Sequence, residues 1–380
     1  MAEHAARLRR WLDANTDGLA AHRARPEGGM AGAVEHERSL LRLLFEAGWS
    51  RRGWPVEAGG LGGPATLRAV LYDELAAADV EVPEAFVLLE TLGPVLTRYA
   101  PELAAHHLPR YLAGDELWGQ GFSEPGAGSD LASLTTTARR TDTGFRVTGQ
   151  KVWTTLGQFA SHAAVLARTG GAGHRGLSLV WVDLSTPGVT VKPITAANGR
   201  DEFAEIFFDD VPVPANCLIG ELNDGWAIAM YLLQFERGMY AWLRQAVLHQ
   251  RLRATSAAVL NGPTPVDATG HIELGRGYLA ATALRARCAG TVRQLAAGEN
   301  PGPAISVDKV LLSRAEQAVF DAGRVARLSA MVLSDALPDR TLREEWFYSR
   351  VTSIFGGAVE VQRDILADRV LHLPRSDRGR

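Results

Sequence analysis

The strongest constraint on the fold is a change in the spacing of apolar residues along the 380-residue chain. Before about residue 117 and after about residue 220, apolar residues recur every three to four positions, which is typical of helices. Between them, short Thr- and Val-rich stretches alternate apolar with polar residues and are separated by Gly/Pro turns. The sequence therefore predicts an α+β multidomain protein, with an N-terminal helical domain (1–116), a small β-barrel or sandwich (117–220) and a C-terminal helical bundle (221–380).

Charge and composition exclude several classes of function. The net charge is −3 and no basic stripe is present, so nucleic acid is not an expected partner. Cys217 and Cys288 are the only cysteines and form no CxxC, which argues against a disulfide scaffold or zinc site and favours a cytoplasmic protein. His106 and His107 have no third ligand at metal spacing, so we expect them at the surface and expect no metal. No apolar run approaches the ~20 residues of a membrane span.

A glycine-rich segment, GFSEPGAGSD (121–130), exposes much backbone and little side chain. Such a segment forms either a tight turn or a stretch of backbone that lies close to a ligand. It is not a dinucleotide fingerprint, because the third glycine is absent and β-like sequence follows. It is not a phosphate-binding Walker loop either, because no Gly-Lys-Ser/Thr follows. Taken alone, the segment favours a turn between a helix and a strand.

The order of several motifs gives this segment a context. GFSEPGAGSDLASL (121–134) is followed by VTGQKVWTT (147–155), FFDDVPVP (207–214) and GGAVEVQRDILADRVLHLPR (356–375). Together with GWPVEAGGLGG (53–63) and GELNDGWAIAMYLLQFERG (220–238), this series resembles the acyl-CoA dehydrogenase family along essentially the whole chain. The resemblance implies α,β-dehydrogenation of an acyl thioester with FAD as the cofactor.

The same resemblance assigns residues to the cofactor. Phe122 and Ser123 would lie against the flavin ring and Ser129 would reach the pyrophosphate, where small residues let backbone N–H groups approach an anion. Trp153 would cover one face of the isoalloxazine and Thr155 would bond near N5. Gln120 and Phe122 could equally be wall residues without direct contact. The full set implied for FAD is Gln120, Phe122, Ser123, Gly128, Ser129, Trp153, Thr155, Gly357 and Glu360.

The resemblance also raises the question of the catalytic base. Many members carry a glutamate before a Gly-Thr near the C-terminus, but this chain has Gly356 there. A subgroup that includes isovaleryl-CoA-type enzymes carries the base on a bundle helix in a Glu-Arg pair, which matches Glu236 and Arg237. The surroundings are apolar, as a carboxylate with a raised pKa requires. Glu236 is the expected base, with the Gly356 N–H bonding the thioester carbonyl and Phe235, Arg237 and Tyr240 lining the substrate; a solvated Glu236 is the alternative.

Two departures from the family pattern bear on assembly. Ala358 replaces a threonine, and NGPTPVDATGH (261–271) replaces a stretch with an arginine that reaches a neighbouring subunit's FAD, although Arg276 could substitute. Three hypotheses follow: a dehydrogenase with electron-transfer flavoprotein as acceptor, a non-catalytic subunit of a hetero-oligomer, or a flavin oxidase or monooxygenase on the same fold. A homo- or hetero-tetramer is implied. The room left by Gly356 favours branched, cyclic or bulky acyl groups, on CoA or on an acyl-carrier protein.

Overall fold

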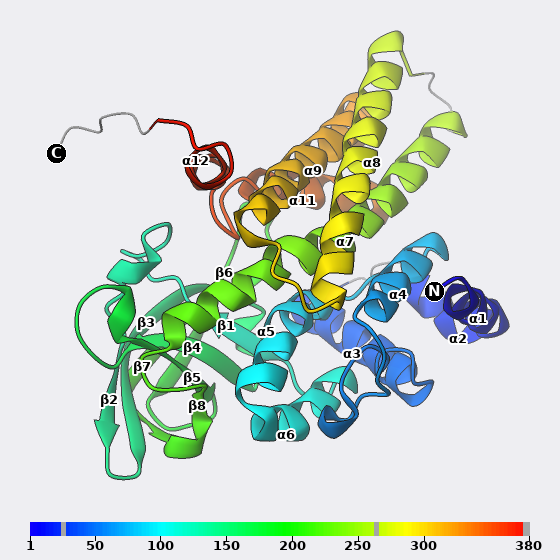
Figure 1. Cartoon of the computed structure of the whole chain (residues 1–380). Coiled ribbons are helices and arrows are strands. Elements are labelled where there is room, and N and C mark those ends of the chain that lie inside the picture. The colour runs from blue at the N-terminus through cyan, green and yellow to red at the C-terminus, as the bar shows by residue number, and fades with distance from the viewer. Residues whose placement is uncertain (24–27, 262–265, 375–380) are drawn as a thin grey trace. The chain divides into compact units, whose positions relative to one another are not determined.

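The computed structural model describes residues 1–23, 28–261 and 266–374 (Figure 1). The chain forms two compact units, each built from segments that are distant in sequence. One unit, here called the bundle unit, comprises residues 1–15, 69–82 and 236–380. The other, the sheet unit, comprises residues 16–68 and 83–235. The domain limits at 116 and 220, taken from the change in apolar spacing, stay predictions. Residues 262–265, part of the expected break between two helices, lie outside the described part of the chain.

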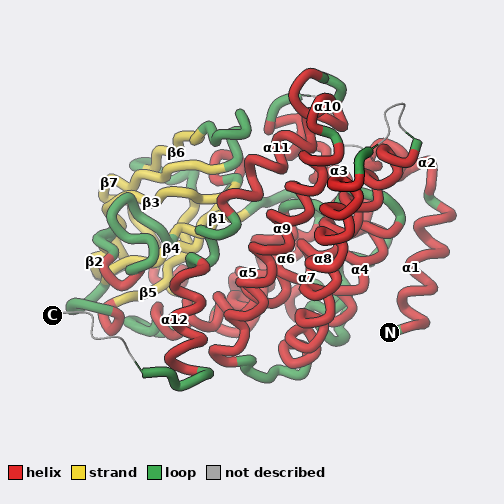
Figure 2. The backbone as a smooth tube through the Cα atoms, turned by 90° about the horizontal axis from the view of Figure 1, so that it is seen from above, coloured by secondary structure: helices red, strands yellow, loops and turns green. Residues whose placement is uncertain are grey.

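The sheet unit is organised around one eight-stranded sheet (Figure 2). Its strands run in the order β6-β7-β3-β2-β4-β5-β8, with β1 pairing parallel to β4 beside this path. The predicted β domain is therefore confirmed, but as an open sheet and not as a closed barrel. The strands are β1 (Trp118–Gly121), β2 (Thr137–Thr141), β3 (Gly144–Thr155), β4 (His162–Arg168), β5 (Leu177–Asp183), β6 (Val189–Ile194), β7 (Phe203–Pro214) and β8 (Leu218–Ile219).

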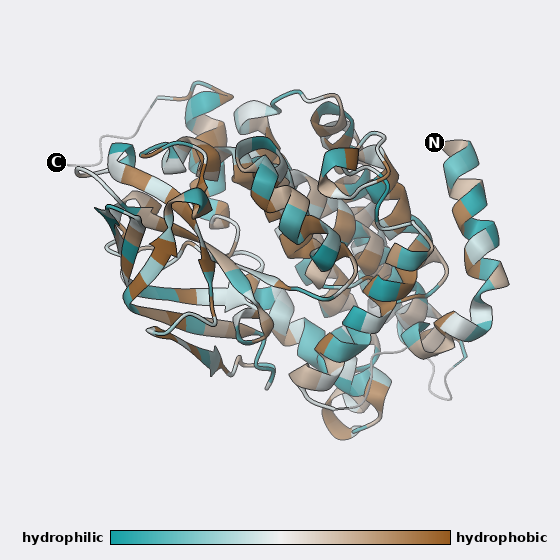
Figure 3. Cartoon of the chain, turned by 90° about the horizontal axis from the view of Figure 1, so that it is seen from below, coloured by the Kyte–Doolittle hydropathy of each residue, from teal (hydrophilic) through white to brown (hydrophobic). Residues whose placement is uncertain are grey.

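The sheet's core follows the alternation seen in the sequence on β7, whereas β4 is buried on both faces. On β4, Ala163, Val165 and Ala167 point to the same face and are fully buried. On β7, Ile206 and Phe208 point to this face. The alternation then shifts by one residue, so that Val211 and Val213 point to the same face. Colouring by hydropathy shows the same alternation of apolar and polar residues along the strands (Figure 3). Helices α2 (Thr16–Leu19), α3 (Met30–Glu46), α5 (Ala85–Tyr99) and α6 (Pro101–Leu112) complete the unit.

The bundle unit is helical. Helix α9 is its centre, because α8, α10, α11 and α12 all contact it (Figure 1).

The start of α11 differs from the sequence prediction. The capping-box residues Thr341 and Glu344 predict a start at Thr341, but the helix begins four residues earlier at Leu337, and Pro338 occupies its first turn. The helices are α1 (Ala2–Ala14), α4 (Thr66–Ala77), α7 (Gly225–Leu260), α8 (Ala268–Ala296), α9 (Ser306–Ala326), α10 (Leu328–Leu333), α11 (Leu337–Val351) and α12 (Val359–Arg369); α4 and α7 begin in the sheet unit.

Two arginines of α7 fix this helix within the bundle unit. Arg244 makes a bidentate pair with Glu316 of α9, at 2.6 and 3.0 Å. Arg251 bonds Glu345 of α11 at 2.9 Å and Glu81 at 3.1 Å. Because these pairs are largely buried, removing one partner would leave an uncompensated charge, which costs about 3–5 kcal/mol. No helix in the described part of the chain is long and apolar enough to cross a bilayer.

Candidate active site

The carboxylate of Glu236 lies directly over Gly356. A Cβ placed on Gly356 would come within 3.0 Å of Glu236 Oε1. Glu236 itself is half-buried. The structure thus brings the α7 carboxylate to the same place where a side chain at position 356 would begin.

The faces of α7 and α9 explain this placement. Glu236 lies two turns before Arg244 on α7, and Lys309 lies two turns before Glu316 on α9. Residues two turns apart share a face of a helix. The Arg244–Glu316 pair therefore orients both helices so that Glu236 and Lys309 approach each other.

Lys309 is the second charged group at this position, and sequence reasoning did not assign it a role. Its Cε lies 3.4 Å from the same Cβ position on Gly356. Its ammonium donates to the carbonyl of Thr352 and sits 4.4 Å from the centroid of Phe355. Burial lowers the pKa of Lys309 to about 8, and the nearby carboxylates of Glu236 and Glu316 oppose this shift. Lys309 and Glu236 thus lie close enough for their charges to interact.

The backbone next to Glu236 and Lys309 has a conformation that favours glycine at two consecutive positions. Gly356 and Gly357 have φ of +63° and +89°, the left-handed region that is costly for residues with a Cβ. A side chain on Gly357 would meet the amide of Gln362, and Arg237 Nη2 lies 3.5 Å away. Among the described residues, Arg237 Nε and Gln362 Nε2 are buried donors without a partner. Buried unpaired donors are rare, so these two are suited to an acceptor that is not part of the chain.

In the sheet unit, the glycine-rich segment starts as a tight turn and then opens. The backbones of Glu124 and Ala127 exchange two hydrogen bonds, at 3.0 and 3.1 Å. Beyond this turn, Gly128 and Ser129 are exposed, and nothing lies within 4 Å of a Cβ placed on Gly126 or Gly128. The expected turn is present at 124–127, but it lies between β1 and β2 and not between a helix and a strand; the contact with a ligand stays a prediction.

A buried ion pair holds this turn against the sheet. Glu124 accepts bonds from Lys151 Nζ at 2.8 Å, from both the N–H and the hydroxyl of Thr135, and from the N–H of Thr136. Burial alone would raise the pKa of Glu124, but the Lys151 charge and these hydrogen bonds lower it to about 2. Lys151 Nζ also bonds the carbonyl of Phe122 at 3.0 Å. This pair positions the backbone at 122–124, and it was missed from the sequence although the chain has only three lysines.

Trp153 is the clearest irregularity of the sheet. It has φ of +63°, which is an outlier for a bulky residue, and its side chain is 58% exposed. The pairing of β3 with β7 shifts register between Lys151 and Thr154, so a bulge turns the indole outward. It contacts Phe203 edge-on with centroids 6.1 Å apart. Strained residues cluster at ligand sites, and this one presents a flat apolar face to its surroundings.

The other expected site residues are placed as follows. Phe122 is buried, Ser123 accepts a backbone bond from Val152 at 2.9 Å, and Gln120 and Thr155 are half-buried on β1 and β3. On α7, Phe235 packs on Tyr231 at 5.1 Å, and Tyr240 lies 6.0 Å from Phe355. Glu360 is exposed in the first turn of α12, and Arg276 is exposed on α8 and pairs with Glu273 at 2.5 Å.

Comparison with known proteins decides the family. The models for "Acyl-CoA dehydrogenase, middle domain" and "Acyl-CoA dehydrogenase, C-terminal domain" match residues 119–211 and 223–371. The acyl-CoA dehydrogenase IpdE1 of Mycobacterium tuberculosis is 36% identical over 386 aligned residues, covering 99% of each chain. The chain belongs to the acyl-CoA dehydrogenase family. It is therefore an oxidoreductase of the type that dehydrogenates acyl-CoA thioesters, as the motif series predicted.

Further relatives of this acyl-CoA dehydrogenase include a cyclohexane-1-carbonyl-CoA dehydrogenase of Geobacter metallireducens, 30% identical over 357 residues that cover 89% of this chain and 90% of the relative. Among solved structures, the Tcur3481-Tcur3483 steroid ACAD superposes with a TM-score of 0.84 at 27% identity, covering 99% and 98% of the two chains. The ChsE4-ChsE5 complex from Mycobacterium tuberculosis gives 0.79 at 29% identity and 98% coverage of each chain.

Proposed function

We propose that this chain dehydrogenates an acyl thioester between its α and β carbons, with Glu236 as the base. In this reaction Glu236 accepts the α-proton, the β-hydrogen leaves with the electron pair of its C–H bond, and a C=C bond forms. The observation that carries the proposal is the 3.0 Å approach of Glu236 Oε1 to the Cβ position of Gly356. The carboxylate on α7 thus takes the position of the glutamate that many family members carry where this chain has Gly356.

FAD fits the residues present and would accept the departing hydride. In the sheet unit, the open backbone at Gly126 and Gly128 suits the pyrophosphate, because no Cβ holds an anion away. The outward, strained indole of Trp153 suits one face of a planar ring. In the bundle unit, the unpaired donors Arg237 Nε and Gln362 Nε2 suit an anionic or carbonyl acceptor.

Lys309 prepares Glu236 for proton transfer. A base must be ionised to accept a proton, and a neighbouring positive charge favours that form. We therefore assign Lys309 a positioning and charge-balancing role beside the base.

Ring-bearing acyl-CoA thioesters are the substrate class that we propose. The space beside Gly356 is taken by the Glu236 carboxylate and by Lys309, so the substrate class is proposed from the relatives. Two similar proteins carry names with ring substrates, a steroid ACAD and a cyclohexane-1-carbonyl-CoA dehydrogenase. Straight long-chain acyl groups lack the rings that these two names share, so we expect lower kcat/KM for them.

Anaerobic mixing of the FAD-loaded chain with thioesters tests the activity. Cyclohexanecarbonyl-CoA or a steroid acyl-CoA should bleach the visible flavin band and yield a product lighter by two hydrogens, and palmitoyl-CoA should do so more slowly. Electron-transfer flavoprotein is the acceptor we expect, so oxygen should not sustain turnover. Rapid oxygen consumption would instead support an oxidase on this fold.

A second candidate is a subunit that acts only with a homologous partner chain. Two similar structures are described as pairs of gene products, Tcur3481-Tcur3483 and ChsE4-ChsE5. The bundle unit also exposes large apolar side chains, which often mark an interface: Ile272, Tyr278 and Leu279 on α8 and Leu328, Val332 and Leu333 on α10. Flavin retained and reduced by the purified chain alone supports a homo-oligomer, whereas a colourless chain that gains flavin only with a partner supports the second candidate.

A further inference from the structure

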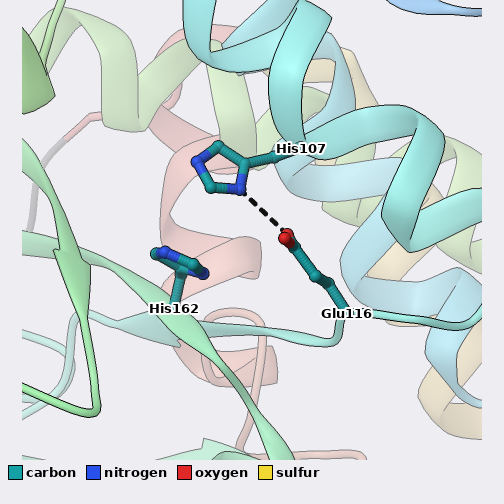
Figure 4. A group of neighbouring side chains, drawn as sticks. All are labelled: His107, Glu116 and His162. Atoms are coloured by element: carbon teal, nitrogen blue, oxygen red, sulfur yellow. Dashed lines mark hydrogen bonds and ion pairs between the residues drawn. The ribbon is translucent and has the colours of Figure 1, made fainter.

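Three side chains that can bind a metal meet in the sheet unit, apart from the residues assigned to the reaction. His107 comes from α6, Glu116 from the loop between α6 and β1, and His162 begins β4 (Figure 4). One ligand atom of each lies within 4.8 Å of the others. His107 and Glu116 are buried and His162 is half-buried.

This cluster corrects the expectation that His107 is a surface residue. Its side chain is only 6% exposed, whereas His106 is exposed. The expectation of no metal rested on the spacing of His106 and His107 along the chain. The sheet brings Glu116 and His162 to His107 from other elements, which spacing alone does not reveal.

The hydrogen bonds determine which histidine atoms can bind. Ser161 Oγ donates to the Leu117 carbonyl at 3.2 Å, so it accepts from His162 Nδ1–H at 3.0 Å. His107 Nδ1 donates to Glu116 Oε2 at 2.9 Å. His162 Nε2 then carries a lone pair, as in metal-ligating histidines whose other N–H is held by an oxygen. His107 and Glu116 can bind the same ion only if their hydrogen bond is replaced, so His107 would bind through Nδ1 and Glu116 through Oε2.

A pocket gives an ion access to the cluster. Its volume is about 620 Å³, and its wall includes His107, His162, Asp183 and Cys217. Asp183 lies directly across from His162 in the pairing of β4 with β5, so the two side chains share a face of the sheet. Burial raises the pKa of the Cys217 thiol, and the negative charge of the nearby Asp183 raises it further. The pocket therefore offers two further ligands besides water.

We propose that His107, Glu116 and His162 form a binding site for a divalent transition-metal ion, with Zn²⁺ as the best match and Asp183 or a water as the fourth ligand. Two imidazoles and a carboxylate form a set that Zn²⁺ prefers, and tetrahedral Zn²⁺ needs ligand distances of about 2.0–2.2 Å. Tetrahedral ligands at these distances lie about 3.3–3.6 Å apart, so atoms that are now up to 4.8 Å apart must close by up to about 1.5 Å, which side-chain rotation supplies.

Metal binding adds two positive charges, which the carboxylates of Glu116 and of Asp183 as fourth ligand would offset. Glu116 Oε1 keeps its 3.2 Å contact to Arg110, while Oε2 exchanges the His107 N–H for the metal. The ion ties α6, the loop before β1 and β4 together, so binding stabilises the folded sheet unit. The competing interpretation is a hydrogen-bonded network in which Glu116 is already satisfied by His107 and Arg110.

Metal titration of the full-length protein distinguishes these two. We expect one Zn²⁺ per chain by elemental analysis after dialysis, and a higher melting temperature with added ZnCl2. His162→Gln should lower the affinity at least about tenfold without unfolding the chain, since His162 is half-buried. His271→Gln, which changes an exposed histidine of α8, serves as the matched control and should bind like wild type.

Cobalt substitution tests the ligand set independently of stability. A Co²⁺-loaded chain should show the visible absorption of a tetrahedral site, and this should be lost in His162→Gln. Thiolate charge-transfer absorption that disappears in Cys217→Ser would show that Cys217, and not Asp183, is the fourth ligand. Equal Zn²⁺ binding by wild type and His162→Gln, or no stoichiometric binding at micromolar Zn²⁺, would overturn the proposal and leave a hydrogen-bonded network.

Discussion

Replacing Gly356 with alanine tests the geometry around the base. The added Cβ would lie 3.0 Å from Glu236 Oε1 and 3.4 Å from Lys309 Cε. A carbon–oxygen contact of 3.0 Å is too short, so the carboxylate must move by a few tenths of an ångström. Because a displacement of about 1 Å can cost 10²-fold in rate, we expect a three- to tenfold loss of kcat.

The alanine also has a backbone cost, because the left-handed conformation at φ of +63° disfavours a Cβ by about 1–2 kcal/mol. Gly302→Ala separates the two effects, since Gly302 has the same φ of +63° and no atom within 4 Å of its Cβ position. Both variants should lose the backbone cost in urea unfolding, with a further loss in Gly356→Ala from its 3.0 Å contact, and only Gly356→Ala should lose kcat in an anaerobic stopped-flow assay. Equal kcat for the two variants would refute the placement of Glu236 against residue 356.

Three further perturbations test other parts of the account. Lys309→Met removes the positive charge beside Glu236, so the acidic limb of the pH profile of kcat/KM should move to higher pH by about 1 unit or more; an unmoved limb contradicts the proposed role. Trp153→Leu should lower the flavin-to-protein ratio after gel filtration and change the melting temperature little, because the indole is exposed; unchanged flavin content would count against it. Lys151 and hydrogen bonds from Thr135 and Thr136 lower the pKa of Glu124 from 4.5 to about 2, so ionised Glu124 should contribute on the order of 3 kcal/mol above about pH 4.5, lost as pH falls through 2. Burial, which lowers the pKa of Lys151 to about 8, reduces the net gain from the pair. Between pH 5 and 2, denaturant titrations should show a larger loss of stability in wild type than in Glu124→Gln, and equal losses would contradict this role.

The large-scale architecture could be predicted because it depends on local patterns. The spacing of apolar residues changes at both ends of the strand-rich region, and the strands fall where Thr- and Val-rich segments alternate. Whether the sheet closes depends on which strands meet at its edges, and this is a long-range property. The open path ending at β6 and β8 therefore could not be derived from residues 117–220 alone.

In the candidate site too, residues within sequence motifs could be predicted, whereas residues placed by long-range packing could not. Glu236 and the glycines at 356–357 carry motif signals, and Trp153 stands in a recognisable segment. Lys309 has no such signal, because its importance comes from the packing of α9 against α7 and from its burial. His162 is similar, since only the pairing of β4 with β1 and the position of α6 bring it to His107.

A single-turnover measurement on Glu236→Gln tests the central claim most directly. The FAD-loaded variant should keep its flavin and its thioester affinity, because the amide nearly matches the carboxylate in shape. Its reduction by the best acyl-CoA should fall by at least about 10²-fold, since general-base catalysis contributes about that much. Glu299→Gln, at an exposed position of the bundle unit, should reduce at the wild-type rate. Reduction of Glu236→Gln at the wild-type rate would show that another group removes the α-proton.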